Sequence, residues 1–317
     1  MLPLHRKAKQ YLTLTVKLLI VSGAFYFIYT RIAGSAQTDW QRFTNILSDK
    51  KPFGLITLIL LCTFLNRFIE ILKWQNLAKI ITPTNKAQAT EQVMAALTVS
   101  VFTPNGIGEY AAKTLYYKKE QAKKVIFLNL ICNGIQLLIA VLAGITGFII
   151  FNAFYSVISV SLLLSILGAL LAVIALVTSV RKFTIRGYSL HSLTNGINQL
   201  PKVLHRKNML LALARYITII HQQYFIFVAL GIKVSYPLLI STIAAVYFLG
   251  SSLPNFQFVD FAVKGSVAVF SMALLGINDW ITLFTATLIW VLNIVIPVTI
   301  GSYYVLRFKK ESFNSRS

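Results

Sequence analysis

Residues 103–113 read TPNGIGEYAAK and interrupt an apolar region that extends from 92 to 117. Pro104 and the two glycines of this stretch cannot continue a regular helix. Positive charge flanks the region on both sides, and the cluster that follows it contains Lys118, Lys119, Lys123 and Lys124. A single crossing would place that cluster outside the cell, whereas Lys and Arg are enriched in cytoplasmic loops. We therefore predict a re-entrant helical hairpin that enters from the cytoplasm and leaves on the same side.

A second break resembles the first. Residues 253–265 read LPNFQFVDFAVKG and lie inside the apolar region 236–276. Each break contains Pro-Asn, a short irregular piece, and then an acid, an aromatic residue, alanine, any residue and lysine. The charge pattern places the second hairpin on the opposite membrane face, so that the two form an inverted repeat, an architecture that recurs in transporters.

A structural alternative exists for both breaks. They would be packing kinks, and each acid would simply pair with the lysine four residues later, Glu109 with Lys113 and Asp260 with Lys264. Charges inside a membrane are expensive, at about 2.5–3.5 kcal/mol each near a helix centre. That cost favours a functional reason for keeping them.

The composition requires a membrane. Of 317 residues, 56% are hydrophobic and only 12% are charged, which is too little charge to cover a soluble globule. Apolar runs that approach the roughly 20 residues needed to cross a bilayer occur at 11–30, 53–72, 125–151, 156–179, 209–230 and 280–305. We predict an all-α polytopic membrane protein with about six full transmembrane helices and two opposed re-entrant hairpins.

The chain is expected to form one transmembrane domain over residues 1–317. Arg6, Lys7 and Lys9 precede the first apolar run, which places the N-terminus in the cytoplasm and makes 1–10 and 307–317 cytoplasmic tails. The N-terminus resembles a cleavable signal peptide, but its apolar stretch is longer than such signals use, and a retained span is favoured. The connection 181–207 is basic and amphipathic and could lie on the inner leaflet.

The formal charge of +21 is not expected to indicate nucleic-acid binding, because the basic residues lie in the connections between spans. Cys62 and Cys132 lie in separate apolar segments without a CxxC or Cys/His cluster. Neither a disulfide framework nor a zinc site is implied. We expect no metal and no cofactor.

Polar residues within the apolar runs fall on helical stripes. One stripe contains Asn66, Arg67, Glu70 and Lys73; a second contains Asn129, Asn133 and Gln136; a third contains Arg215, Thr218 and Gln222, with His221 beside it; Asn293 lies in the last span. Together they predict a polar groove at the centre of the bundle. Each stripe also has a simpler interpretation: the cations would snorkel to a membrane surface, and the amides and His221 would hold helices together.

The chain resembles the transmembrane, flippase-like domain of bacterial lysylphosphatidylglycerol synthases and its stand-alone relatives. The resemblance rests on NRFIEILKWQNL at 66–77 and on the two breaks. It implies movement of a phospholipid with a polar, often aminoacylated, head group between leaflets. The family's functional positions would correspond to Arg67, Glu70, Gly106, Gly108, Glu109, Asp260 and Lys264. We expect no synthase half in this chain, so aminoacyl transfer is not implied. The second break departs from the glycine-rich form at Phe256, Gln257 and Phe258.

We expect a lipid flippase or a related transporter in the bacterial cytoplasmic membrane, not an enzyme. Glu109 and Asp260 would bind a cationic head group or exchange protons, and the basic residues would hold phosphate. The expected substrate-binding residues are Arg67, Glu70, Asn105, Gly106, Gly108, Glu109, Lys113, Asn133, Arg215, Gln222, Asp260 and Lys264. The expected partners are membrane phospholipids and a separate lipid-synthesis enzyme. Two alternatives remain, a membrane-embedded lipid-modifying transferase and a scaffold that transports nothing.

Overall fold

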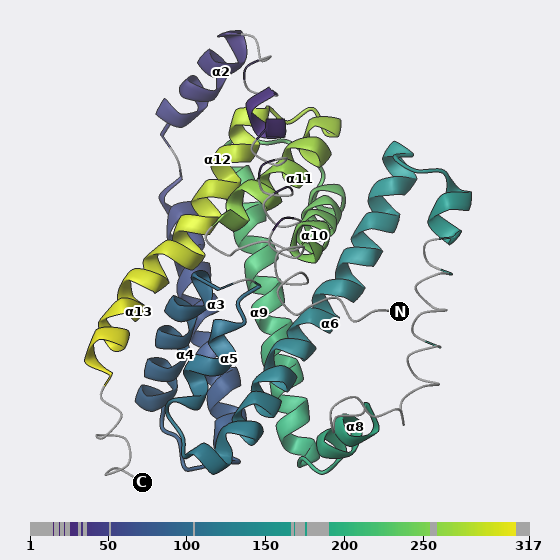
Figure 1. Ribbon diagram of the computed structural model, residues 1–317. Coiled ribbons are helices and arrows are strands. Elements are labelled where there is room, and N and C mark those ends of the chain that lie inside the picture. Colours follow the sequence, from purple (N-terminus) through teal and green to yellow (C-terminus); the bar gives the residue numbers. More distant parts are fainter. Residues whose placement is uncertain are drawn as a thin grey trace.

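A computed structural model gives the fold (Figure 1). It describes residues 26–30, 37–50, 52–103, 105–165, 190–253 and 259–308, and the single positions 15, 19, 22, 33, 168 and 175. Most of the predicted span 11–30 and half of the predicted span 156–179 lie outside the described residues. The same is true of the tail 1–10, most of the tail 307–317, Pro104 and the second break at 254–258.

Every regular element in the described part is helical, which confirms the all-α prediction. The helices are α2 (Gln37–Ser48), α3 (Phe53–Ala78), α4 (Lys86–Val101), α5 (Gly108–Thr114), η1 (Lys119–Gln121), α6 (Ala122–Tyr155), α8 (Leu190–Asn198), α9 (Lys202–Ala229), α10 (Tyr236–Ser252), α11 (Asp260–Leu274), α12 (Asp279–Trp290), η3 (Val291–Val295) and α13 (Ile296–Arg307). Within this part, three continuous helical stretches are long and apolar enough to cross a membrane, Phe53–Ala78, Lys119–Tyr155 and Asp279–Arg307. The chain is therefore an all-helical membrane protein.

Two boundaries differ from those predicted by hydropathy. α3 continues past residue 72 to Ala78, so Lys73 lies inside the helix instead of in a cytoplasmic connection. Its side chain is fully buried, and the snorkelling interpretation of Lys73 is wrong. The connection 181–207 contains the short helix α8, and α9 already begins at Lys202, because Pro201 occupies its N-cap, where a missing N–H costs little.

Two helical hairpins surround the sequence breaks. α4 and α5 pack against each other, and so do α10 and α11. Figure 1 shows the first hairpin in the lower half of the bundle and the second in the upper half. α5 has only seven residues, so at about 1.5 Å per residue it cannot cross a bilayer. α4 starts with a capping box in which Asn85 and Gln88 exchange hydrogen bonds.

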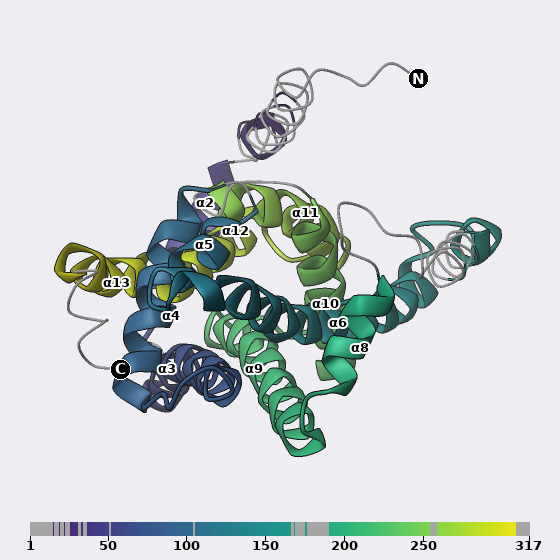
Figure 2. The same ribbon diagram turned by 60° about the horizontal axis from the view of Figure 1, so that its bottom comes forward.

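The remaining helices hold the two hairpins in place. α3 packs along α9, α10 packs along α6, α4 packs along α13, and α11 packs along α12. Figure 2 shows α3 and α9 side by side and α11 across the bundle from them, while α10 also contacts α9. α12, η3 and α13 form one continuous stretch, so a single long helix contacts the second hairpin with its first part and the first hairpin with its last part.

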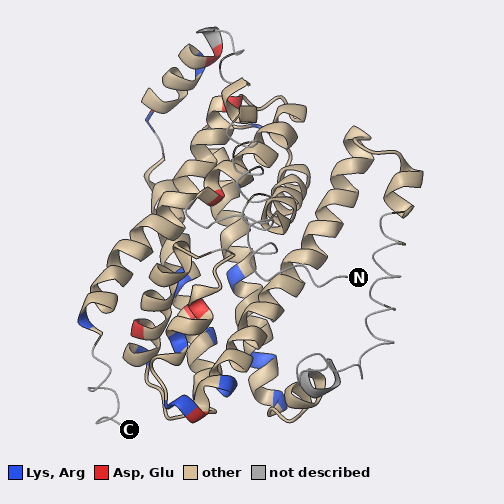
Figure 3. Ribbon diagram, in the orientation of Figure 1, with Lys and Arg blue, Asp and Glu red and all other residues tan. Residues whose placement is uncertain are grey.

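Charge is distributed unevenly over the bundle. Figure 3 shows Lys and Arg gathered at the end where α4, α6 and α9 begin. The acidic residues are few, and some of them lie deep among the helices.

Candidate functional site

α3 and α9 form the first wall of the site. The helices run antiparallel, because a residue early in α3 meets one late in α9 and the reverse also holds. Gln222 Nε2 donates to Thr63 Oγ1 at 2.7 Å, while Asn76 Nδ2 donates to the backbone oxygen of Leu204 at 3.1 Å. This register brings the polar stripes predicted on the two helices to the same interface.

Glu70 is the centre of a charge cluster at that interface. Its Oε2 lies 3.0 Å from Arg215 Nη1 and 3.1 Å from Lys73 Nζ. Lys73 also donates to Gln136 Oε1 at 3.2 Å, and Arg215 Nε donates to Asn66 Oδ1 at 2.9 Å. The i, i+3 and i, i+4 spacings put Asn66, Glu70 and Lys73 on one face of α3. One carboxylate thus offsets two cations, the fully buried Lys73 and the partly exposed Arg215.

The last long helix is irregular at the same depth. At η3 it widens into a π-helical turn, in which the N–H of Ile296 bonds to the oxygen of Val291, five residues earlier. Pro297 follows directly and has no N–H to offer to the oxygen of Asn293, its usual partner four residues back. The carbonyl of Asn293 is therefore free to accept a bond from outside the helix.

Arg67 donates the hydrogen bond that this carbonyl accepts. Its Nη2 donates to Asn293 O at 2.8 Å. The side chain of Asn293 joins three helices, because Oδ1 accepts from Asn66 Nδ2 at 2.5 Å and Nδ2 donates to Gln222 Oε1 at 2.8 Å. Arg67 Nε is buried and has no partner in the described part of the chain, and none of the described carboxylates forms an ion pair with this guanidinium.

The tip of the first hairpin depends on its glycines. Asn105 has φ of 52° and Gly106 has φ of 69°, both in the left-handed region that glycine and asparagine tolerate best. Thr103 Oγ1 accepts from the N–H of Gly108 at 2.8 Å. A Cβ at Gly108 would lie 2.8 Å from Thr103 Cγ2 and 2.9 Å from the oxygen of Val99. Only a glycine fits at position 108.

Lys113 is fully buried and its ammonium is surrounded by partners. Its Nζ lies 2.7 Å from Glu109 Oε1 and 2.7 Å from Asn129 Oδ1. It also lies 4.3 Å from the centre of the Trp74 ring, a cation–π contact. Asn133 Nδ2 donates to the other carboxylate oxygen of Glu109 at 3.3 Å. Lys113 therefore orients Glu109. Its own ammonium is enclosed by Glu109, Asn129 and Trp74.

The base of this hairpin is tied to α3. Gln92 Oε1 accepts from Trp74 Nε1 at 2.6 Å and from Tyr117 Oη at 2.9 Å. These bonds fix the position of Glu109 relative to the Glu70 cluster.

The second hairpin carries a similar pair in a more open setting. Lys264 Nζ lies 2.7 Å from Asp260 Oδ2 and 5.2 Å from the centre of the Tyr247 ring. The side chain of Lys264 is 30% exposed, whereas that of Lys113 is completely buried. α10 and α11 approach closely, because a Cβ at Gly250 would lie 2.8 Å from Lys264 Cγ.

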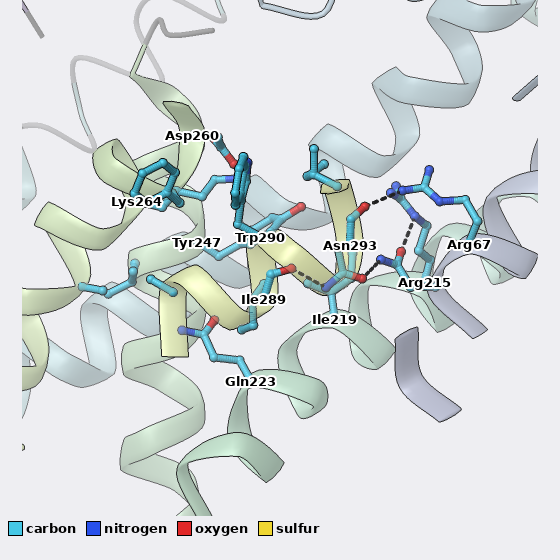
Figure 4. Close-up of a pocket in the computed structure, with 16 residues that line it drawn as sticks. Arg67, Arg215, Ile219, Gln223, Tyr247, Asp260, Lys264, Ile289, Trp290 and Asn293 are labelled. Atoms are coloured by element: carbon cyan, nitrogen blue, oxygen red, sulfur yellow. Dashed lines mark hydrogen bonds and ion pairs between the residues drawn. The ribbon is translucent and has the colours of Figure 1, made fainter. Parts of the chain in front are cut away.

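Two cavities meet at the arginines. The first, of about 140 Å³, is lined by residues that include Asp260, Lys264, Tyr247, Trp290 and Asn293. The second, of about 380 Å³, is lined by residues that include Asn105, Gly106, Glu109, Asn133 and Glu70. Arg67, Arg215 and Ile294 line both. Figure 4 shows the first cavity, with Asp260 and Lys264 at one side, the two arginines at the other, and Asn293 between.

The structure brings nine of the twelve predicted site residues to these cavities. They are Arg67, Glu70, Asn105, Gly106, Glu109, Asn133, Arg215, Asp260 and Lys264. The other three, Gly108, Lys113 and Gln222, do not line either cavity and instead support residues that do. The expectation that Lys113 reaches a substrate phosphate therefore disagrees with its position.

Several lining residues were not among those predicted. Tyr247, Phe261 and Trp290 form an aromatic wall of the first cavity, and the rings of Phe261 and Trp290 are 5.0 Å apart. Aromatic residues are common in apolar spans, so hydropathy does not distinguish these three. Asn293 was visible as a lone polar residue in a span, but its role depends on contacts with residues more than 200 positions earlier.

The charges of the site favour an anion. In the described part of the bundle, the cations Arg67, Lys73, Lys113 and Arg215 are accompanied by two carboxylates, Glu70 and Glu109. Asp260 and Lys264 balance each other. Buried charge is costly without a counter-charge, and a guanidinium fork matches the geometry of a phosphate. An anionic group between Arg67 and Arg215 would reduce the imbalance.

Comparison with models of protein families agrees with the resemblance found in the sequence. A comparison with curated proteins gave no match. The family model described as the lysylphosphatidylglycerol synthase TM region matches residues 14–255. The match includes Arg67, Glu70, the whole first hairpin and Arg215, and it ends before Asp260 and Lys264. Because it covers most of the chain, this protein belongs to the lysylphosphatidylglycerol synthase TM region family.

Proposed function

We propose that the protein moves a phospholipid, or another lipid with a polar head group, between the two leaflets of the membrane. The observation that carries the proposal is the shared wall of the two cavities. Arg67 and Arg215 line both of them, one cavity contains Glu109 of the first hairpin, and the other contains Asp260 of the second. A head group could thus remain in contact with the same two guanidinium groups while it leaves one cavity for the other.

The groups of each cavity suit different parts of a phospholipid. Arg67 and Arg215 would hold the phosphodiester, since each presents a planar fork of donors. Glu109 and Asp260 would meet a cationic part of the head group or exchange protons, with Lys113 and Lys264 setting their positions. Tyr247 and Trp290 would offer their ring faces to an ammonium group or to the glycerol carbons.

The proposed topology has about six crossings and two opposed re-entrant hairpins related as an inverted repeat. Several features support it: the seven-residue length of α5, the placement of the two hairpins in opposite halves of the bundle, and the basic end from which α4 enters. Both termini would be cytoplasmic, in the cytoplasmic membrane of a bacterium. Cysteines introduced at Lys118 and at Asp49 test this orientation, since only the first should react from the cytoplasmic side.

Liposomes that contain the purified protein and a labelled phospholipid provide the main experiment. The wild-type protein should accelerate exchange of the label between leaflets, and Glu109→Gln and Arg67→Gln should slow it. Glu120→Gln and Arg206→Gln are matched controls, because Glu120 and Arg206 are exposed and line neither cavity. Wild-type protein that binds the lipid without accelerating its exchange would refute the proposal.

The same experiment separates the two alternatives. A lipid-modifying transferase that uses Glu109 and Asp260 as a carboxylate pair would need both at one substrate, whereas they line different cavities. Chemical change of the labelled lipid would nevertheless favour it. A scaffold for a separate lipid-synthesis enzyme would keep its function after both acid-lysine pairs are neutralised.

A further inference from the structure

The long helix α12–η3–α13 connects the two hairpins through an irregular turn. α12 packs along α11 of the second hairpin, and α13 packs along α4 of the first. The contact of α13 with α4 is very close, because a Cβ at Gly301 would clash with the oxygen of Met94. α13 and the first hairpin must therefore move together, as must α12 and the second hairpin.

The turn between these two parts lies where the cavities meet. Trp290 and Asn293 line the first cavity, and Ile294 lines both. Pro297 removes one helical hydrogen bond, and the π-helical turn replaces the regular pattern before it. A helix bends most easily at such a place. Bending here would change the separation between the hairpins and the width of the passage between the cavities.

We propose that Asn293 is a positioning residue for the phosphate-binding arginines, and that the π-helical turn Val291–Val295 is the hinge between the two halves of the protein. Arg67 holds the Asn293 carbonyl at 2.8 Å and thereby closes the passage. An anion that enters either cavity competes for this guanidinium, because phosphate is a stronger acceptor than a neutral carbonyl. When Arg67 turns to the anion, the Asn293 carbonyl loses its partner and the hinge is released.

The side chain of Asn293 limits how far the hinge can move. Its bonds to Asn66 and Gln222 tie the turn to both α3 and α9, which pack along each other as an antiparallel pair. The turn thus stays at the arginines while the two ends of the long helix change their angle. The hinge rests on the proposed lipid movement for its purpose. Amide exchange and the distances between spin labels nevertheless test the hinge without measuring transport.

Pro297→Ala is the decisive variant. Alanine supplies the missing N–H, so the oxygen of Asn293 gains a partner within its own helix, and the turn can become regular. Amide exchange over residues 291–296 should slow by roughly tenfold, the equivalent of about one net hydrogen bond. Pro52→Ala is the matched control, because Pro52 lies at the N-cap of α3, away from the hinge, and should leave this exchange unchanged.

Spin labels measure the hinge directly. Labels at Leu60 and Phe270, both exposed, report α11 of the second hairpin against α3, and labels at Leu60 and Leu306, which is also exposed, report α13 against α3. The first pair should give a broad or double distance distribution that shifts when short-chain phosphatidylglycerol is added, and Pro297→Ala should narrow it. The second pair should not change.

Unchanged distances and unchanged exchange in a folded Pro297→Ala variant would overturn the proposal. If that variant does not fold, Asn293→Leu gives a second test: it removes the side-chain ties but keeps the carbonyl, and the Leu60–Phe270 distribution should broaden. An Asn293→Leu variant identical to wild type would also overturn it. A hinge that moves in a wild-type protein that transfers no lipid would refute only the proposed function.

Discussion

Arg215 lies between a carboxylate and an amide of one neighbouring helix: its Nη1 is 3.0 Å from Glu70 Oε2, and its Nε donates to Asn66 Oδ1 at 2.9 Å. The same guanidinium is a wall of both cavities. Arg215 is thus held in place by α3, while Arg67 is held by a backbone oxygen and by no carboxylate among the described residues. The two arginines of the site therefore differ in how firmly each is fixed. Substitutions of Glu70, which holds Arg215, and of Arg67 should accordingly have different effects.

Glu70→Gln should destabilise the protein strongly. It removes the counter-charge of Lys73 and Arg215, and breaking a buried ion pair from one side costs about 3–5 kcal/mol. Thermal unfolding in detergent measures the loss. Glu70→Gln combined with Lys73→Met should recover part of it, because the double variant leaves one fewer uncompensated cation. A Glu70→Gln variant as stable as wild type would contradict this account of the cluster.

Arg67→Gln should weaken anion binding with little loss of stability. Because Arg67 has no carboxylate partner to leave behind among the described residues, its removal leaves only the Asn293 carbonyl without a donor. A charge-assisted hydrogen bond contributes about 1.5–3 kcal/mol, so affinity for short-chain phosphatidylglycerol should fall by about tenfold or more. Calorimetric titration measures this. Arg67→Lys keeps the charge and should bind with intermediate affinity, and equal affinity in all three proteins would exclude Arg67 from the site.

Lys113→Met and Lys264→Met should affect different properties, although both change the lysine of the same motif. The first should lower stability, and the second should mainly weaken lipid binding. Lys113 is fully buried with two hydrogen-bond partners, and its loss should cost about 1–3 kcal/mol of stability. Lys264 is partly exposed and lines a cavity, so its loss should cost under about 1 kcal/mol and act mainly on lipid binding. Unfolding temperature and lipid affinity, measured on both variants, separate the two effects. Equal destabilisation by both changes would contradict this prediction.

Gly108→Ala should distort the tip of the first hairpin. The added methyl group would lie 2.8 Å from Thr103 and 2.9 Å from the oxygen of Val99. Such overpacking costs about 1–3 kcal/mol. Gly54→Ala is the matched control, because a Cβ there meets nothing within 4 Å, and alanine is the better helix former. Unfolding temperature should fall for the first variant and stay level or rise for the second.

The local pattern of the sequence was sufficient to predict much of the architecture. Apolar length determines which segments can be membrane helices, and the long helices α3, α6 and α12–α13 were anticipated from it. The Pro-Asn breaks predicted where helices stop, since proline and glycine act on their own backbone. Helix periodicity placed Asn66, Glu70 and Lys73 on one face. These inferences succeeded because each depends on residues within a few positions of one another.

Helix ends and burial were harder to predict. Hydropathy ended the second span at residue 72 because Lys73 is charged, yet the helix continues to Ala78 and buries that lysine against Glu70 and Gln136. Gln136 lies on α6, and a single-segment hydropathy window does not include a partner from another helix. The penalty for burying Lys73 is offset by contacts that form only when the bundle assembles.

The sequence by itself determined that this protein is an all-helical membrane protein with two interrupted segments, each carrying an acid and a lysine. Only the tertiary structure decided that Lys113 is buried while Lys264 faces a cavity, and that Arg67 reaches the carbonyl of Asn293, 226 residues further along the chain. The physical reason is that helix formation follows local hydrogen bonding and hydrophobicity. The environment of a charge, in contrast, depends on which distant helices pack against it.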